Sequence, residues 1–150
     1  MVKVVNKDVE ILKQKAESAV AGDIETVARD LLDTLQAYSH SCVGMAANMI
    51  GVPKAIIAVD VTAQPGREFS VGRKSELTVM LNPKLLKASP RTYDTEEGCL
   101  SLEGTRQVKR HEWIEVSYRD MQWKKQRRRF SGFVAEIIQH EMNHLDGKII

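Results

Sequence analysis

Residues 132–147 read GFVAEIIQHEMNHLDG, and this stretch predicts the central helix of the fold. At about 3.6 residues per turn, its spacing places one set of side chains on a single face: Phe133, Ile137, His140 and His144. Further apolar side chains occupy much of the remaining circumference: Val134, Ile138, Met142 and Leu145. A helix that is apolar nearly all round lies inside a protein. We therefore expect a buried helix over 132–145, with Gly147 placed to end it.

The two histidines of this helix form a metal-binding pattern. His140 and His144 lie about one turn apart on one face, so both imidazoles can bind one metal ion. Glu141 lies beside the first histidine, where it can take a proton from a water on the metal without being a ligand. The alternative is an amphipathic helix with two incidental histidines. The chain contains only 4 histidines, which makes the His-Glu-x-x-His spacing rare by chance and favours the metal site.

A third ligand is expected upstream, because six residues follow His144 in this sequence. The candidates are Cys42, Cys99 and several acidic residues. Cys99 is favoured because it lies in EGCLS (97–101), where Gly98 permits an unusual backbone approach. A thiolate with two imidazoles suits Fe²⁺ or Zn²⁺, and three protein ligands leave a position open for water, as in catalytic sites. Taken alone, Cys99 is typical of a buried free cysteine.

A third phrase, CVGMAANMIGV (42–52), contains small residues that permit close approach of a bound chain or strand: Gly44, Ala46 and Ala47. Taken alone, it is typical of a tight turn into a strand. Together the three phrases resemble the peptide deformylase family, which carries G-x-G-x-A-A-x-Q, E-G-C-x-S and Q-H-E-x-D-H-x-x-G in this order. The resemblance runs from about Leu31 to Ile150 and includes smaller matches: Leu81-Asn82-Pro83, Arg106, Arg110 and Leu145-Asp146-Gly147.

The resemblance implies an α+β fold in which antiparallel β-sheets surround the metal-binding C-terminal helix, as a single catalytic domain over 1–150. It implies a metal-dependent hydrolase that removes the N-formyl group from the initiator methionine of nascent polypeptides and releases formate. Cys99, His140 and His144 would hold one divalent ion, with Fe²⁺ favoured over Zn²⁺, Ni²⁺ or Co²⁺. Glu141 would carry the proton, and the backbone N–H of Leu100 would stabilise the oxyanion.

The resemblance also implies the substrate contacts. Val43, Gly44 and Gly98 would hold the substrate backbone in an extended pose. Arg106 would contact the substrate further along, and Ile137 would line the apolar methionine pocket.

Three positions depart from the family pattern. Cys42, Asn143 and Met49 stand where the family has a glycine, an aspartate and a glutamine. The family's glutamine donates a hydrogen bond to the oxyanion, and a thioether cannot donate. Two other functions therefore stay open at this point. One is a metallopeptidase or other amidase that uses the same centre, and the other is a low-activity paralogue that acts on or binds another acylated or processed peptide N-terminus.

The composition is that of an ordinary globular protein. The chain has 150 residues, of which 43% are hydrophobic and 28% charged, with a net charge of +2. That charge is too small to indicate binding to nucleic acid or a membrane, and no apolar run predicts a signal peptide or a membrane span. Two cysteines fit a reducing compartment, so we expect a cytoplasmic protein with no membrane and no specific DNA binding. The resemblance implies nascent peptides as its partners.

One basic run, KKQRRR (124–129), has two interpretations. It can make a transient contact with ribosomal RNA, or it can be a solvated strand edge whose charges deter aggregation, and the second is favoured. His40 and His111 have no partner pattern and are interpreted as ordinary surface or core residues. Trp113 and Trp123 are assigned to packing.

The other elements follow from periodicity and turn residues. One helix is expected over 8–21, ending at a break at Gly22. A second helix is expected after a cap at Asp23, where the spacing produces an apolar face: Ile24, Val27, Ala28, Leu31, Leu35 and Tyr38. Strands are expected over 55–61, over 77–81 with a stop at Asn82-Pro83, over 114–119, and from a turn at 120–123 through Phe130. Residues 64–75 read as a loop.

Overall fold

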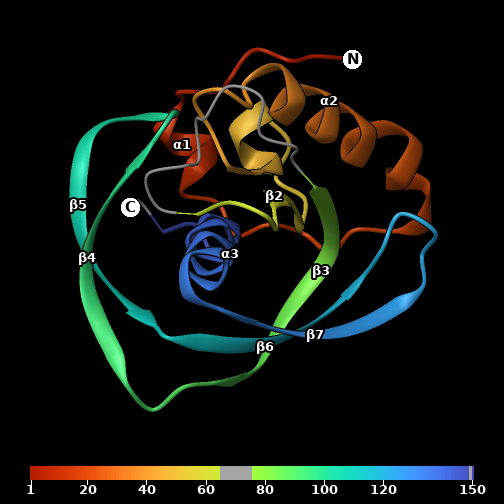
Figure 1. The fold of residues 1–150 in the computed structure, drawn as a ribbon. Coiled ribbons are helices and arrows are strands. Elements are labelled where there is room, and N and C mark those ends of the chain that lie inside the picture. Colours follow the sequence, from red (N-terminus) through yellow and green to blue (C-terminus); the bar gives the residue numbers. More distant parts are fainter. Residues whose placement is uncertain (65–75, 149) are drawn as a thin grey trace.

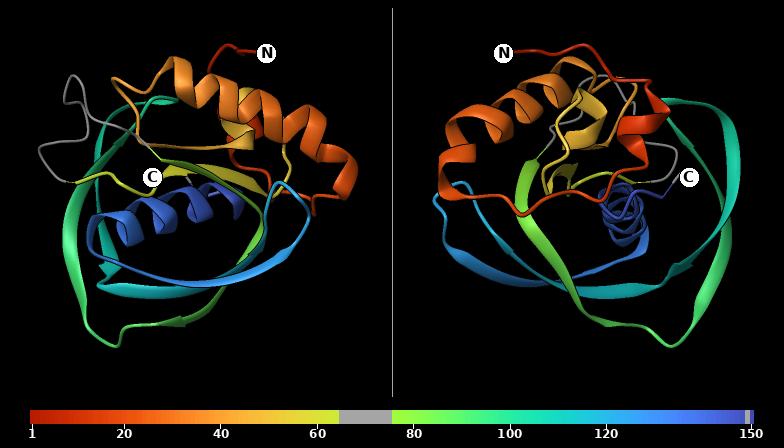
Figure 2. Two further views of the ribbon diagram at one scale, coloured as in Figure 1. Left: turned by 45° about the vertical axis from the view of Figure 1, so that its right-hand side comes forward. Right: turned by 180° about the vertical axis from the view of Figure 1, so that it is seen from behind.

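Helix α3 (Gly132–Leu145) passes through the middle of the molecule, and the strands wrap around it (Figure 1). The structure is a computed structural model that describes residues 1–64, 76–148 and 150. The other described helical segments precede the first strand or follow it closely: α1 (Val9–Leu12), η1 (Ala21–Asp23), η2 (Ile24–Ala28), α2 (Arg29–Ala37) and η3 (Ala47–Ile50). Figure 2 shows α2 on the outside of the molecule and α3 enclosed by strands.

Two antiparallel sheets enclose α3. The larger has five strands in the order β1-β2-β3-β6-β7 and the smaller pairs β4 with β5. Their bounds are β1 (Gly44–Ala46), β2 (Ile56–Asp60), β3 (Leu77–Ala88), β4 (Thr92–Cys99), β5 (Leu102–His111), β6 (Trp113–Arg119) and β7 (Lys125–Ser131). This arrangement confirms the α+β fold with antiparallel sheets around the C-terminal helix. Among the described residues, no helix has the length and apolar character needed to cross a membrane.

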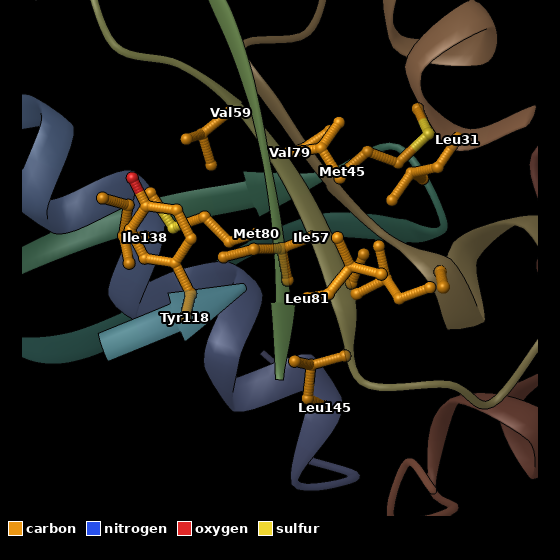
Figure 3. Close-up of a cluster of buried hydrophobic side chains, with 14 of the residues drawn as sticks. Leu31, Met45, Ile57, Val59, Val79, Met80, Leu81, Tyr118, Ile138 and Leu145 are labelled. Carbon is orange, nitrogen blue, oxygen red and sulfur yellow. The ribbon is translucent and has the colours of Figure 1, made fainter. Parts of the chain in front are cut away.

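The core forms where α2, the large sheet and α3 meet. Leu31 from α2, Met45 from β1, Met80 from β3 and Ile138 from α3 are all fully buried (Figure 3). Burial of apolar side chains from each layer is the main stabilising contribution to such a fold. The same packing explains why α3 is apolar nearly all round, as the sequence predicted.

The end of α3 confirms the role expected of Gly147. The N–H of Gly147 donates to the His144 carbonyl (3.0 Å) and that of Lys148 to the Asn143 carbonyl (3.0 Å), which is the Schellman pattern. Gly147 has a φ of +78°, and a Cβ there would overlap the Lys13 carbonyl. Only glycine suits this position, because both the backbone angle and the close contact exclude a side chain.

Several strand and helix predictions are confirmed. The strands predicted over 55–61 and 114–119 are β2 and β6, and the turn at 120–123 leads into β7. The second helix is present over 24–37, with Leu31 and Leu35 fully buried. The predicted cap is wrong, because the Asp23 carboxylate accepts a hydrogen bond from the Val20 N–H (2.8 Å) and caps no helix N–H.

The helix predicted over 8–21 is wrong beyond its first turn. Asp8 caps α1 by accepting from the Glu10 N–H (3.0 Å), but α1 ends at Leu12. The chain then becomes extended and bonds to distant backbone: the Ala16 N–H donates to the Leu145 carbonyl (2.8 Å), and Glu17 forms a parallel bridge with Lys54. These tertiary hydrogen bonds override the local helix propensity.

The strand predicted to stop at Asn82 instead continues to Ala88. Asn82 adopts a φ of +53°, and the pairing with β6 shifts register between Leu81 and Lys84. The Asn82 side chain also accepts from the Ala19 N–H (2.7 Å) and donates to the Ala19 carbonyl (2.9 Å). Asn82-Pro83 is therefore a bulge that bends β3. The loop predicted over 64–75 lies almost entirely outside the described residues.

Candidate active site

Three side chains that can bind a metal meet at the centre of the molecule. The Sγ of Cys99 and ring nitrogens of His140 and His144 all lie within 4.8 Å of one another. The two Nε2 atoms are 3.1 Å apart. Two nitrogens bound tetrahedrally at the usual distance to zinc would be about 3.3 Å apart, so the spacing fits a shared ion.

Local structure explains this meeting. The histidines are one turn apart on α3, as their spacing predicted. Cys99 ends β4, and the β4–β5 pairing shifts register between Gly98 and Cys99. Such a bulge bends a strand and redirects its side chains, and here Cys99 reaches the histidines.

Glu97 sets the orientation of His140. Its Oε1 lies 2.7 Å from His140 Nδ1, so Nε2 points to the cluster. Arg110 donates to both oxygens of Glu97, at 2.9 and 2.6 Å. Burial alone would raise the pKa of Glu97, but the hydrogen bonds from His140 and Arg110 outweigh it and hold the pKa at about 2. Glu97 is therefore an ionised carboxylate that fixes the ring orientation of His140.

The two histidines differ in charge. Burial lowers the pKa of His140, but hydrogen bonds with Cys99 and Glu97 outweigh it and raise the pKa to about 10. Burial and, next, the charge on His140 lower the pKa of His144 to about 3. His144 is neutral at pH 7, and its Nδ1 is buried with no hydrogen-bond partner among the described residues. A neutral imidazole offers the lone pair that a metal needs, and binding of a divalent ion would displace the proton from His140 Nε2, so the donor set fits such an ion.

Glu141 lies beside this cluster but outside the three-residue ligand group. Its Oε1 is buried and has no partner in the described part of the chain, although the residue lines the cavity. Burial raises the pKa of Glu141 to about 7, while the charge on His140 lowers it. A carboxyl with a pKa near 7 in the lining of a cavity can both accept and release a proton.

A cavity of about 280 Å³ opens in front of the cluster. Nine of the sequence-predicted site residues line it: Val43, Gly44, Met49, Gly98, Cys99, Leu100, Ile137, His140 and Glu141. Two do not. His144 is fully buried behind the cavity wall, and Arg106 lies on β5 opposite Glu97, outside the lining.

Strand β1 and helix η3 form another wall of the cavity. A Cβ on Gly44 would lie only 2.6 Å from Ile137 Cγ2, so β1 approaches α3 as closely as glycine allows. Met49 is buried against the cavity, and its Sδ accepts from the Ala46 N–H (3.4 Å). The Asn48 amide donates to the His144 carbonyl (2.8 Å), and Asn48 does not line the cavity.

The comparisons with known proteins agree with this geometry. The family model described as polypeptide deformylase matches residues 1–150. The chain belongs to the polypeptide deformylase family. The fold, the hydrolase class and the metal dependence expected of a deformylase therefore apply to it.

Individual deformylases are similar over nearly the whole chain. The peptide deformylase of Clostridium beijerinckii is 47% identical over 150 residues, covering all of both chains. That of Picosynechococcus is 38% identical over 140 residues, covering 91% of this chain and 70% of that relative. A crystal structure of the class I type b peptide deformylase from Acinetobacter baumannii has a TM-score of 0.84 and 31% identity, covering 99% of this chain and 96% of that one.

Sequence reasoning missed part of the deformylase site. Glu97 and Arg110 received no role, and Glu136 was not considered, yet Glu97 and Glu136 line the cavity. Spacing carried a usable signal in two cases. Glu97 is two residues before Cys99 on a strand, and Glu136 is four residues before His140 on a helix, so each shares a face with a predicted ligand.

Proposed function

We propose that this deformylase removes the N-formyl group from the initiator methionine of nascent polypeptides in the cavity between α3 and β1, and that residues 1–150 form one catalytic domain. Cys99, His140 and His144 hold one divalent ion, and Glu141 moves the proton. The supporting observation is the spacing of three ligand atoms within 4.8 Å beside a cavity-facing carboxyl that is not a ligand.

When bound, a divalent ion supplies two kinds of chemistry: it lowers the pKa of a water, and it polarises the formyl carbonyl. Glu141 accepts the proton of the attacking water and later delivers it to the departing amine. Its pKa of about 7 suits both roles, because the carboxyl can change protonation state near neutral pH without a large cost. The products are formate and a peptide with a free amino terminus.

The oxyanion side of the site has fewer donors than the family pattern. We assign the backbone N–H of Leu100, which follows Cys99 at the cavity wall, as one donor. Met49 stands at the family's glutamine position and cannot donate. Asn48 does not replace it, because its amide already donates to the His144 carbonyl. Stabilisation of the oxyanion therefore depends more on Leu100 and on the ion here than in a deformylase that keeps the amide donor.

The substrate enters along the cavity wall. Val43, Gly44 and Gly98 are placed to bind an extended backbone, and Ile137 supplies an apolar wall for the methionine side chain. Arg106 contacts the substrate only beyond the cavity, since it is not part of the lining. The A. baumannii deformylase has a crystal structure with Met-Ala-Ser bound, and it matches this fold with a TM-score of 0.82 at 30% identity.

The resident ion is proposed to be Fe²⁺, with Zn²⁺, Ni²⁺ or Co²⁺ as alternatives, because one thiolate and two imidazoles suit all four. A cytoplasmic location follows from the substrate. The proposed transient contact with the ribosome rests on the exposed basic side chains of β7 and the turn before it: Lys124, Lys125, Arg127, Arg128 and Arg129.

An anaerobic assay tests the activity. The protein is loaded with Fe²⁺, and release of formate from formyl-Met-Ala-Ser is compared with release of acetate from acetyl-Met-Ala-Ser. We expect formate from the first peptide and little acetate from the second. Equal hydrolysis of both would indicate a general amidase, and tight binding of the peptide without formate release would indicate a binding paralogue.

A further inference from the structure

The outer face of strands β3, β6 and β7 carries many basic side chains. On β6 the side chains of Ile114, Val116 and Tyr118 are buried in the core, so the alternate positions point outward. Residues directly opposite each other on antiparallel strands share a face, so the pairing also identifies the outward positions of β3 and β7. The basic face consists of Lys84 and Lys87 of β3, Glu115, Ser117 and Arg119 of β6, and Lys125, Arg127 and Arg129 of β7.

The residues of the basic face form an array. Strand pairing arranges them in rows across the strands: Lys87 with Glu115 and Arg129, Lys84 with Ser117 and Arg127, and Arg119 with Lys125. Neighbouring strands lie about 4.8 Å apart, and successive outward positions of one strand about 6.8 Å apart. Six cations against one carboxylate exceed the net charge of +2 of the whole chain, so the rest of the chain is net acidic. The positive charge of the protein is therefore concentrated on this face.

Most of these cations are free to bind an anion. Five of the six are exposed and the other, Arg119, is half-buried. Among the described residues, Arg127 is the only one of the six in an ion pair, and its Nη2 donates to Glu115 Oε2 (2.7 Å). Arg129 instead lies over the ring of Trp113, with 4.1 Å between Cζ and the ring centroid. Such stacking orders a guanidinium without neutralising its charge, so less side-chain entropy is lost when Arg129 binds an anion.

Protection of a sheet edge does not explain the basic face. β7 is an edge strand, and charges on an edge strand deter pairing with other chains. β3 and β6 each have a strand on both sides, yet they contribute Lys84, Lys87 and Arg119. These cations guard no edge. A polyanion that lies across all three strands accounts for them together with the cations of β7.

We propose that the basic face binds the phosphate backbone of RNA, and that this RNA belongs to the ribosome. Arginine and lysine are the side chains that neutralise phosphates, and a chain of regularly spaced phosphates is complementary to an array of cations. Phosphate contacts carry no sequence information, so the binding is independent of base sequence. The choice of ribosomal RNA rests on the proposed function, because an enzyme that acts on nascent polypeptides meets the ribosome. The phosphate chemistry rests on the basic face alone.

Two pairs of variants test the basic face away from the cavity. The first variant removes three exposed, unpaired cations from it in one chain: Lys84→Gln, Lys125→Gln and Arg129→Gln. Its control removes the same charge from exposed positions in the segment around α1, which lies on the other side of α3 from β6 and β7 (Figure 1): Lys7→Gln, Lys13→Gln and Lys15→Gln. In the second pair, Ser117→Glu adds a carboxylate among the cations, and Ser117→Gln adds similar bulk without the charge.

Binding is measured with two RNA probes. Fluorescence anisotropy follows a labelled oligouridylate over a range of KCl concentrations, and sedimentation follows purified large ribosomal subunits. Polyglutamate and vesicles of phosphatidylglycerol are tested in parallel as an acidic polypeptide and an anionic membrane. Thermal unfolding of each variant confirms that it is folded before its binding is compared.

Four exposed, unpaired cations predict a slope of about −3 in log K against log salt concentration, at about 0.7 for each contact with single-stranded RNA. The triple variant of the basic face should reduce the slope by about 2 and bind both RNA probes at least about tenfold more weakly. The control around α1 should stay within about threefold of the natural protein. Ser117→Glu should bind more weakly than Ser117→Gln.

Equal RNA affinity in the natural protein and the triple variant would overturn the proposal, as would a salt slope near zero. Tighter binding to polyglutamate or to the vesicles than to RNA would also overturn it, since a protein or a membrane would then be the partner. Binding to oligouridylate but not to the ribosomal subunit would overturn the choice of ribosomal RNA. Formate release from formyl-Met-Ala-Ser by the natural protein is assayed on the same preparation. Its absence would refute the proposed function and leave the binding of RNA phosphates standing.

Discussion

Replacing Gly44 with alanine tests the close approach of β1 to the metal-binding helix. An added Cβ would lie 2.6 Å from Ile137 Cγ2 and 3.0 Å from Glu141 Oε2. The first distance is too short for carbon atoms, so β1 or α3 must move by several tenths of an ångström. Overpacking of this kind costs about 1–3 kcal/mol, which lowers Tm by roughly 2–12 °C in a chain of this size.

The displacement also reaches Glu141, the proposed proton carrier. Because Glu141 is one of the two side chains that the new methyl group meets, we expect kcat to fall by roughly 10-fold to 100-fold. The ion should stay, since neither His140 nor His144 is among the atoms nearest to the added Cβ. Steady-state formate release, thermal unfolding and elemental analysis measure the three quantities separately.

Two other glycines provide controls for the Gly44→Ala variant. A Cβ on Gly98, in the same cavity, would come no closer than 3.6 Å to the Gly104 carbonyl, which is an ordinary contact. Gly98→Ala should therefore keep the Tm, although its KM can rise if Gly98 binds the substrate backbone. Gly22→Ala meets nothing within 4 Å and should change neither quantity. A Gly44→Ala protein with natural Tm and kcat would refute the close packing of β1 on α3.

Three further predictions concern the centre itself. Glu141→Gln should keep the ion and lose about 10²-fold to 10⁴-fold in kcat, and elemental analysis showing metal loss would make Glu141 a ligand. Cys99→Ser, His140→Ala and His144→Ala should each lose the ion, so full occupancy in all three would refute the ligand set. Met49→Gln should raise kcat, by up to roughly 10²-fold to 10³-fold if the amide reaches the oxyanion. No gain in initial rates would mean that position 49 is not the family's glutamine position.

The meeting of the two histidines was predictable because its geometry is local. His140 and His144 need only a helix to lie together, and the helix has a strong apolar pattern. The residues that orient His140 were harder to predict from the sequence. Arg110 meets Glu97 through the pairing of β4 with β5, and neither strand has the apolar alternation that marks a half-buried strand. Without that pairing, the sequence gives no reason to join an acid and an arginine that are 13 residues apart.

The wrong fold predictions share a physical cause. Residues after Leu12 have helix-forming side chains, yet their backbone bonds to α3 and to the chain near Lys54. Asn82-Pro83 has the composition of a strand end, yet Asn82 pairs with Ala19 and β3 continues as a bulged strand. In both places a contact more than 30 residues away in sequence decides the conformation, and local propensity carries no information about it.

Gln139, which comes directly before the His-Glu-x-x-His phrase, helps to fix the rotation of α3 about its own axis. Gln139 accepts from the His111 N–H (2.8 Å) and donates to the His111 carbonyl (3.0 Å), so its amide pairs with β5 as a strand residue would. On the other side of the helix, the Asn48 amide donates to the His144 carbonyl. These three bonds fix α3 to β5 and to η3 at once. A rotation of α3 that moved the imidazoles away from Cys99 would break two partly buried hydrogen bonds at one end of the motif and a buried one at the other, which is costly. Gln139 and Asn48 therefore preserve the geometry of the proposed ligands. For Gln139 this accounts for an amide on α3, where an apolar helix face alone would favour an aliphatic residue.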